Sequence, residues 1–197
     1  MPTHHVYLGL GSNVEREIHI EMALEMLQEH LICLRRSPVY ESVSTDARQS
    51  PFYNLVVSGS TDLCLAEFHE WIKEIEILHG RAGSAHRCVP LDIDILLFDD
   101  LTGIHEGIEL PRAEILDRAF VLYPLQQIAP HLTHPGLGVS FAELWSQLQP
   151  GPSLSPVRHS FAVSSFRLAM QAGNFKRPGD RRQLAAHETA LSSPHPH

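Results

Sequence analysis

The sequence has few cysteines, no long apolar run and few basic residues in its first three quarters, and each shortage excludes a class of protein. Its three cysteines, Cys33, Cys64 and Cys88, include no C-x-x-C pair, so they predict neither a disulfide framework nor a zinc motif. No stretch of about 18 apolar residues is present, which argues against a membrane-spanning helix. The first residues lack the basic and apolar regions of a signal peptide. We therefore expect a cytoplasmic protein with no membrane partner.

Acidic residues dominate most of the chain. Residues 1–150 hold 9 Lys and Arg against 21 Asp and Glu, whereas residues 151–197 hold 6 against 2. Because an acidic body repels a polyanion, we expect no nucleic-acid partner. Binding of an anionic nucleotide would require metal ions and a few local arginines to offset the repulsion.

The composition also changes near residue 150. Residues 1–149 have the mixture of apolar and charged residues of a globular domain. Residues 150–197 are dominated by Pro, Ser, Gly, His and Arg, and we predict that they form a basic, mostly disordered tail. We expect a monomer, with a weak dimer left open.

Hydrophobic periodicity in residues 1–149 predicts the order β-α-β-β-α-β followed by one more helix. Ser12 and Glu15 have the spacing of a capping box for the first helix, and Asp62 is expected to cap the second. This order predicts an α+β, ferredoxin-like fold, in which an antiparallel sheet carries helices on one face. The strands are expected at about 6–10, 33–42, 52–60 and 91–98, and the helices at about 14–30, 62–79 and 119–129.

Asp92 and Asp94 form the first candidate site. Residues i and i+2 of a strand point to the same face, so the two carboxylates are expected side by side, with Ile93 turned into the core. Two such carboxylates repel each other unless a cation lies between them. Mg²⁺ suits this arrangement because it accepts one or two carboxylates, waters and substrate phosphates. From the residues alone, a solvated strand edge remains an equal alternative.

Two further segments have the character of a binding site. Gly9 and Gly11 stand at a strand-to-helix junction, where glycine lets the backbone approach a ligand, although a plain tight turn has the same pattern. Phe52 and Asn54 share a strand face and offer a ring and an amide to a flat heteroaromatic ligand. A core phenylalanine and a strand-end asparagine are the alternative. Arginines suited to phosphate oxygens lie in the loops around the Asp92 strand, at Arg81, Arg87, Arg112 and Arg118.

Taken in order, these segments resemble the hydroxymethyldihydropterin pyrophosphokinase family. The resemblance covers about residues 5–145 and leaves out the tail. The matching segments are Leu8-Gly9-Leu10-Gly11-Ser12-Asn13, Val39-Tyr40-Glu41-Ser42, Phe52-Tyr53-Asn54, Glu76 with Gly80-Arg81, Leu91-Asp92-Ile93-Asp94-Ile95-Leu96-Leu97-Phe98, and Arg118-Ala119-Phe120-Val121-Leu122-Tyr123-Pro124-Leu125 with Ile128-Ala129-Pro130.

The resemblance implies an enzyme of folate biosynthesis. Such an enzyme transfers pyrophosphate from its co-substrate ATP to the hydroxymethyl group of 6-hydroxymethyl-7,8-dihydropterin and releases AMP. The resemblance implies that Asp92 and Asp94 bind two Mg²⁺ ions and act in catalysis together with Arg81 and Arg87. By the same resemblance, the pterin is bound by Ser42, Val43, Phe52, Asn54 and Phe120, and the nucleotide by Glu76, Arg87, Arg112 and Arg118.

The sequence departs from the family pattern at Gly83, where the family has a basic residue, and in two longer segments. Before the Asp92 strand the family usually has R-W-G-P-R-T, whereas Arg87-Cys88-Val89-Pro90-Leu91 is two residues shorter and lacks the tryptophan and the second arginine. Where the family has P-H-P or P-H-Y, this chain has Pro111-Arg112-Ala113, and Arg112 is a candidate replacement for the lost charge. The shortened loop motivates one alternative, a divergent pterin- or nucleotide-binding paralogue with weak or no kinase activity. A second alternative, a protein-interaction module without a small-molecule site, leaves the Asp pair and the Phe52 and Asn54 arrangement unexplained.

Overall fold

The computed structural model describes residues 3–43, 48–80, 88–148 and 154–159. All of them belong to the first of the two units into which the chain divides, Met1–Val163. No helix in these ranges is long and apolar enough to cross a membrane.

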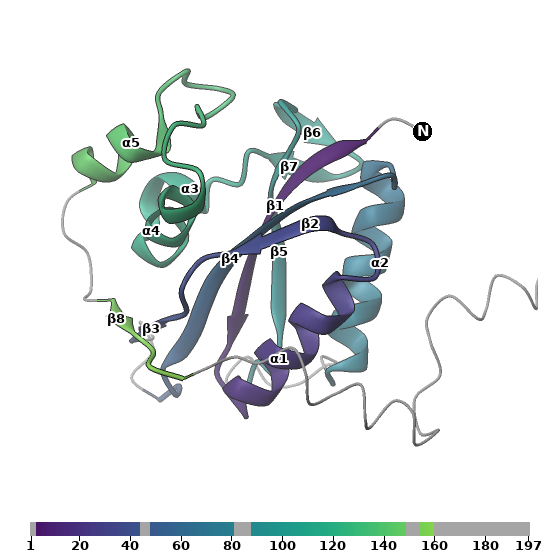
Figure 1. The fold of residues 1–197 in the computed structure, drawn as a ribbon, viewed down its shortest axis with the longest axis vertical. Coiled ribbons are helices and arrows are strands. Elements are labelled where there is room, and N and C mark those ends of the chain that lie inside the picture. Colours follow the sequence, from purple (N-terminus) through teal and green to yellow (C-terminus); the bar gives the residue numbers. More distant parts are fainter. Residues whose placement is uncertain (1–2, 44–47, 81–87, 149–153, 160–197) are drawn as a thin grey trace, which may run out of the picture. The chain divides into compact units, whose positions relative to one another are not determined.

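The molecule is built on an antiparallel sheet in the strand order β5-β1-β4-β3-β8, in which β8 is the short strand Ser155–Pro156, with β2 also paired to β4 (Figure 1). Along the chain the elements follow the order β1-α1-β2-β3-β4-α2-β5, in which β2 and β3 together take the place of the predicted second strand. This order confirms the predicted ferredoxin-like plan. The bounds of these elements are β1 (His4–Ser12), α1 (Arg16–Leu27), β2 (Ile32–Arg36), β3 (Tyr40–Ser42), β4 (Phe52–Thr61), α2 (Leu65–Leu78) and β5 (Asp92–Phe98).

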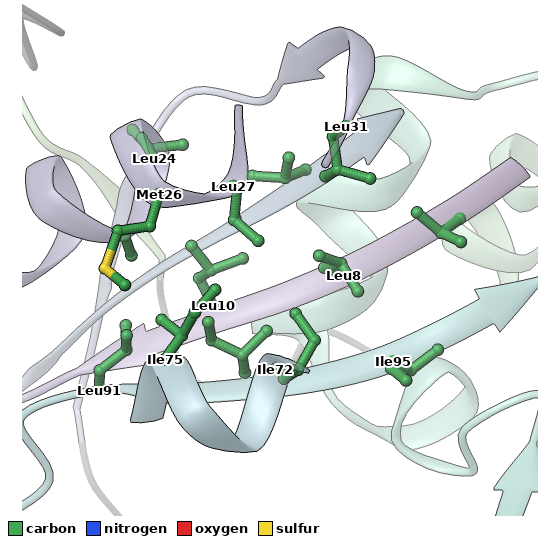
Figure 2. Packing of buried hydrophobic residues seen from close by; sticks show 14 of the residues in the cluster. Leu8, Leu10, Leu24, Met26, Leu27, Leu31, Ile72, Ile75, Leu91 and Ile95 are labelled. Carbon is green, nitrogen blue, oxygen red and sulfur yellow. The ribbon is translucent and has the colours of Figure 1, made fainter. Parts of the chain in front are cut away.

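One face of the sheet is sealed by α1 and α2 (Figure 1). Apolar residues recur along α2 at helical spacing, so that one side of the helix packs on the sheet. Alternate residues of β1 and β5 complete the same core, as Figure 2 shows for Leu8, Leu10 and Ile95. This continuous apolar layer holds the central strands in place.

The starts of both helices differ from the predictions. β1 continues to Ser12, which pairs with Tyr53, so the chain is still extended where a helix cap was expected. The helix α1 begins only after Glu15, which adopts a left-handed conformation and makes no side-chain cap. The cap of α2 is Cys64, whose backbone N–H donates to the Glu67 carboxylate, and not Asp62.

The opposite face of the sheet is only partly covered. A second apolar cluster joins β4 and β5 to α4, so helices lie on both faces and not on one face alone. The helix predicted at about 119–129 is confirmed as α4, whereas the sequence did not predict α3 and α5. The later elements are β6 (Gly103–His105), β7 (Ile108–Leu110), α3 (Glu114–Asp117), α4 (Ala119–Ile128) and α5 (Phe141–Gln147).

The sheet extends past the domain boundary that the composition predicted. The short strand β8 (Ser155–Pro156) pairs with β3 at the edge of the sheet. The backbone N–H of Val157 also donates to the carbonyl oxygen of Val39 at 2.9 Å. Part of the region assigned to the tail is therefore a structural element of the folded domain.

Candidate active site

A cavity of about 500 Å³ opens on the partly covered face of the sheet. It is lined by residues of β1, β3, β4 and β5, by the segment that runs from α3 into α4, and by Leu148. The elements that line it come from distant parts of the sequence, and the sheet register brings them together.

The floor of this cavity is formed by β1, where glycines alternate with core leucines. In the sheet register Gly11 lies between Asn54 of β4 and Asp92 of β5, and Gly9 pairs with Asp94 in the next row. A β-carbon at Gly11 would lie 3.6 Å from Oδ1 of Asn54, so a larger side chain would fill the space above β1. Two strand spacings separate Asn54 from Asp92 by about 10 Å.

Asp92 and Asp94 lie on the same face of β5 and line one end of the cavity. Ile93, between them, is buried in the core on the other face, as predicted. Burial and the negative charge of Asp92 raise the pKa of Asp94 to about 6, and the positive charge of Arg112 acts in the opposite direction. The crowding of the two carboxylates makes this end of the cavity attractive to a cation.

Arg112 is the positively charged residue that contacts Asp94. Its Nη2 donates a hydrogen bond of 2.8 Å to Oδ1 of Asp94 and lies 3.4 Å from Oε1 of Glu114. The predicted nucleotide-binding residue therefore contacts the predicted metal-binding carboxylate directly. This contact was not part of the sequence-based prediction.

The donor set fits a hard divalent cation. Within the described ranges, no group of three or more His, Cys, Asp or Glu residues is arranged to hold a metal ion by itself. A closed structural zinc site needs such a group. Mg²⁺ needs less from the protein, because waters and substrate phosphates supply its remaining oxygens. Asp92 and Asp94, both facing the cavity, offer what such an ion requires.

The opposite end of the cavity carries the residues predicted to bind the pterin. The Nδ2 of Asn54 donates to Oγ of Ser42 at 2.8 Å, and both residues are buried. This bond orients the amide so that its Oδ1 faces Gly11 on the floor. Phe52 and Phe120 line the same cavity from β4 and α4, and Val43, largely exposed, lies at its rim.

Glu76 does not lie in the cavity. It is buried within α2 on the sealed face, where its Oε1 accepts a hydrogen bond of 2.8 Å from the backbone N–H of Ile93. Its Oε2 accepts a bond of 2.7 Å from Lys73. The structure therefore gives this carboxylate an internal partner in the strand that carries the aspartates.

The other predicted nucleotide-binding residues fall in two groups. Arg118, which precedes the first residue of α4, lines the cavity and lies 3.5 Å from Asp117 through its Nε. Arg81 and Arg87 lie outside the described residues. Their predicted roles stay predictions.

Sequence reasoning missed several lining residues. Glu114 and Asp117 of α3 line the acidic end, although acidic residues in the first turn of a short helix are usually only helix-stabilising. Gln49 and Leu148 also line the cavity. The nearness of Glu114 and Asp117 to Arg118 in sequence was an available signal, whereas Leu148 carried none.

Comparison with known proteins identifies the family. Residues 7–130 match the family described as 7,8-dihydro-6-hydroxymethylpterin-pyrophosphokinase (HPPK). The chain belongs to this family. The match includes the cavity-lining residues of β1, β3, β4 and β5, and it ends just after α4.

Individual relatives agree with this assignment. The chain is 38% identical over 134 residues to the 2-amino-4-hydroxy-6-hydroxymethyldihydropteridine pyrophosphokinase of Aquifex aeolicus, covering 66% of this chain and 83% of that protein. It is 34% identical over 139 residues to the folic acid synthesis protein FOL1 of Dictyostelium discoideum, covering 68% of this chain but 21% of that one.

A solved structure shows the same fold. The Plasmodium falciparum HPPK-DHPS A437G crystal structure with SDX-DHP aligns with a TM-score of 0.62 at 18% identity. The alignment covers 74% of this chain and 45% of that one. This chain therefore spans less than half of the length of that protein and about a fifth of FOL1.

Proposed function

We propose that this chain transfers pyrophosphate from ATP to the hydroxymethyl group of 6-hydroxymethyl-7,8-dihydropterin in folate biosynthesis and releases AMP. Family membership supports the reaction class. The observation that carries the proposal is the cavity floor, where the register sets the Asn54 amide and the Asp92 carboxylate on either side of Gly11.

The Asn54 end of the cavity is suited to the pterin ring. An amide oxygen held in place by the Asn54–Ser42 hydrogen bond accepts a ring N–H without having to reorganise. Phe52 and Phe120 offer aromatic surfaces for stacking. We propose that the ring lies between these two phenylalanines, with its hydroxymethyl group directed along β1 toward Asp92.

The acidic end is suited to the reacting phosphates. Asp92 and Asp94 would hold Mg²⁺, with two ions as the family resemblance implies, and the metal supplies charge neutralisation for the triphosphate. The chain's own residues orient the groups: β5 presents the carboxylates, Arg118 lines the cavity, and Arg112 contacts Asp94, so that both arginines are candidates to bind phosphate oxygens. Such transfer depends mainly on positioning and charge, with little covalent work by the protein.

We assign Glu76 to positioning, not to nucleotide contact. Its bond to the Ile93 backbone fixes the strand between the two aspartates.

The test is AMP release from Mg-ATP and reduced hydroxymethylpterin by the purified protein, compared with Asp92→Asn and Asp94→Asn variants. We expect each substitution to lower turnover by about 100- to 1,000-fold. Asp100→Asn, at an exposed turn outside the cavity, is the matched control and should leave turnover unchanged.

Other results would favour the alternative functions. Pterin binding in calorimetry without AMP release would identify a binding paralogue without kinase activity. A protein that neither binds the pterin nor releases AMP would leave the interaction module as the better description.

A further inference from the structure

Arg112 is held close to the carboxylate pair by its backbone. It follows β7, and its N–H donates at 3.0 Å to the carbonyl oxygen of Leu96, two residues beyond Asp94 on β5. From this anchor the side chain turns toward Asp94 and contacts it through Nη2 alone. The guanidinium therefore remains near the cavity whichever partner it binds.

The guanidinium is incompletely satisfied in this arrangement. Its Nε is buried and has no hydrogen-bond partner among the described residues. An arginine fork is best satisfied when two of its N–H groups donate in parallel to two oxygens, as to a phosphate. The contact with Asp94 uses one donor and leaves another buried without an acceptor, so a better acceptor would draw the side chain away.

Two cations compete for the negative charge of Asp94: a divalent metal ion and the Arg112 guanidinium. Under the proposed function it binds a divalent cation, yet in the ligand-free chain Arg112 already neutralises it. A metal ion that approaches alone must displace this guanidinium or accept a positive neighbour. A metal that arrives with a nucleotide brings phosphate oxygens, which offer Arg112 a new partner at the same moment.

We propose that Arg112 is an exchangeable cation, which neutralises Asp94 in the ligand-free chain and passes to a nucleotide phosphate when metal-nucleotide binds. The inference rests on the proposed function, because it assumes a metal on Asp94 and a phosphate beside it. The exchange makes metal and nucleotide binding cooperative. By thermodynamic reciprocity each ligand then raises the affinity of the other by the same factor.

The probe is Mn²⁺, with its affinity for the full chain measured by calorimetry alone and then with a non-hydrolysable ATP analogue. In Arg112→Met we expect Mn²⁺ alone to bind about 5- to 10-fold more tightly, because its competitor is gone. We expect the gain in Mn²⁺ affinity from the nucleotide to shrink by about tenfold. Arg36→Met, on β2 and exposed, makes the same charge change away from the cavity and should alter neither value.

A second variant guards against misfolding of the first. Arg112→Lys keeps the charge but loses the fork, so we expect Mn²⁺ alone to bind as in the parent chain while the nucleotide-induced gain falls. Unchanged Mn²⁺ affinity and unchanged gain in both variants would overturn the exchange.

The proposed function fails in a different way. If the parent chain binds no Mn²⁺, or Asp94→Asn binds it equally well, then the metal site itself is wrong and the exchange falls with it. Loss of the exchange with an intact Asp94-dependent Mn²⁺ site would leave the proposed function standing.

Discussion

The carboxylates of Glu76, in α2, and Asp94, in β5, lie on opposite faces of β5. They carry the same charge, but their surroundings differ. Glu76 reaches the strand from the sealed face, where a backbone N–H and Lys73 satisfy it. Asp94 faces the cavity, beside the like charge of Asp92, and its contact with Arg112 leaves part of the guanidinium unsatisfied. The strand thus separates Glu76, whose carboxylate stabilises the fold, from Asp94, whose carboxylate is available to a ligand in the cavity.

This contrast teaches how to recognise a binding carboxylate. Burial alone does not distinguish the two, since Glu76 is the more buried. The two carboxylates differ in whether the fold supplies enough hydrogen-bond donors and positive charges to stabilise their negative charge. A buried carboxylate with its own partners stabilises the fold, whereas one crowded by a like charge is stabilised best by a ligand.

The largest effect on stability is expected from removing the Glu76 carboxylate, which has its hydrogen-bond partners within the fold. Glu76→Ala leaves the Ile93 N–H buried without an acceptor, and we expect a loss of about 2 kcal/mol in the free energy of unfolding. Asp94→Asn removes a repulsion and should leave stability equal or slightly higher. Urea unfolding of both variants measures the difference. Equal destabilisation by the two substitutions would contradict the contrast between the faces.

The next effect is the pH dependence of the cavity carboxylate. The pKa of Asp94 is raised from its ordinary 3.8 to about 6 by burial and by Asp92. Because metal binding needs the deprotonated form, Mn²⁺ affinity should fall about tenfold per pH unit below pH 6. Calorimetry between pH 5 and 7.5 tests this, and an affinity that stays flat down to pH 5 would contradict it.

The same pKa has a consequence for the metal-free fold. The folded chain binds the Asp94 proton more tightly than the unfolded chain does, so this group stabilises the fold at low pH. Its contribution is present below pH 3.8 and is lost as the pH rises to about 6. In Asp94→Asn this part of the pH dependence of unfolding should disappear.

The smallest effect concerns the edge of the sheet, where β8 pairs with β3, the strand that carries Ser42. A chain ending at residue 159 keeps β8 and should match the full chain in stability and turnover. A chain ending at residue 152 loses the pairing of β8 with β3 and the packing of Val157, and we expect about 1 kcal/mol less stability and a few-fold higher KM for the pterin.

Urea unfolding and steady-state kinetics of the two shortened chains measure this. If the chain ending at 152 matches the full chain, β8 contributes nothing to the site. Composition alone predicts that all of residues 150–197 lie outside the domain, and therefore that the two truncations behave alike.

The sequence predicted the fold and much of the site. Alternation along the Asp92 strand placed both aspartates on one face, and helical spacing located α2 correctly to within a few residues. Both helix caps were predicted wrongly, because Ser12 pairs in the sheet and the N-cap of α2 falls at Cys64. A capping pattern is short, and tertiary strand pairing overrides it.

The contacts that give the residues different roles were beyond sequence reasoning. The placement of Glu76 next to Ile93 and of Arg112 next to Asp94 joins residues 17 and 18 positions apart through the packing of separate elements. Local periodicity states which way a side chain faces but not which element covers it. The family resemblance implied that Glu76 contacts the nucleotide, whereas in the structure its carboxylate accepts a hydrogen bond from the Ile93 N–H on the sealed face.

The sequence by itself determined the alternation of the strands, the order of the elements and the residue types of the site. Those features are local, since a period of two or 3.6 residues follows from backbone geometry. Only the tertiary structure decided that Gly11 lies between Asn54 and Asp92, and that Arg112 forms an ion pair with Asp94. Register and long-range packing depend on how distant segments fill one another's space, and no local pattern encodes that.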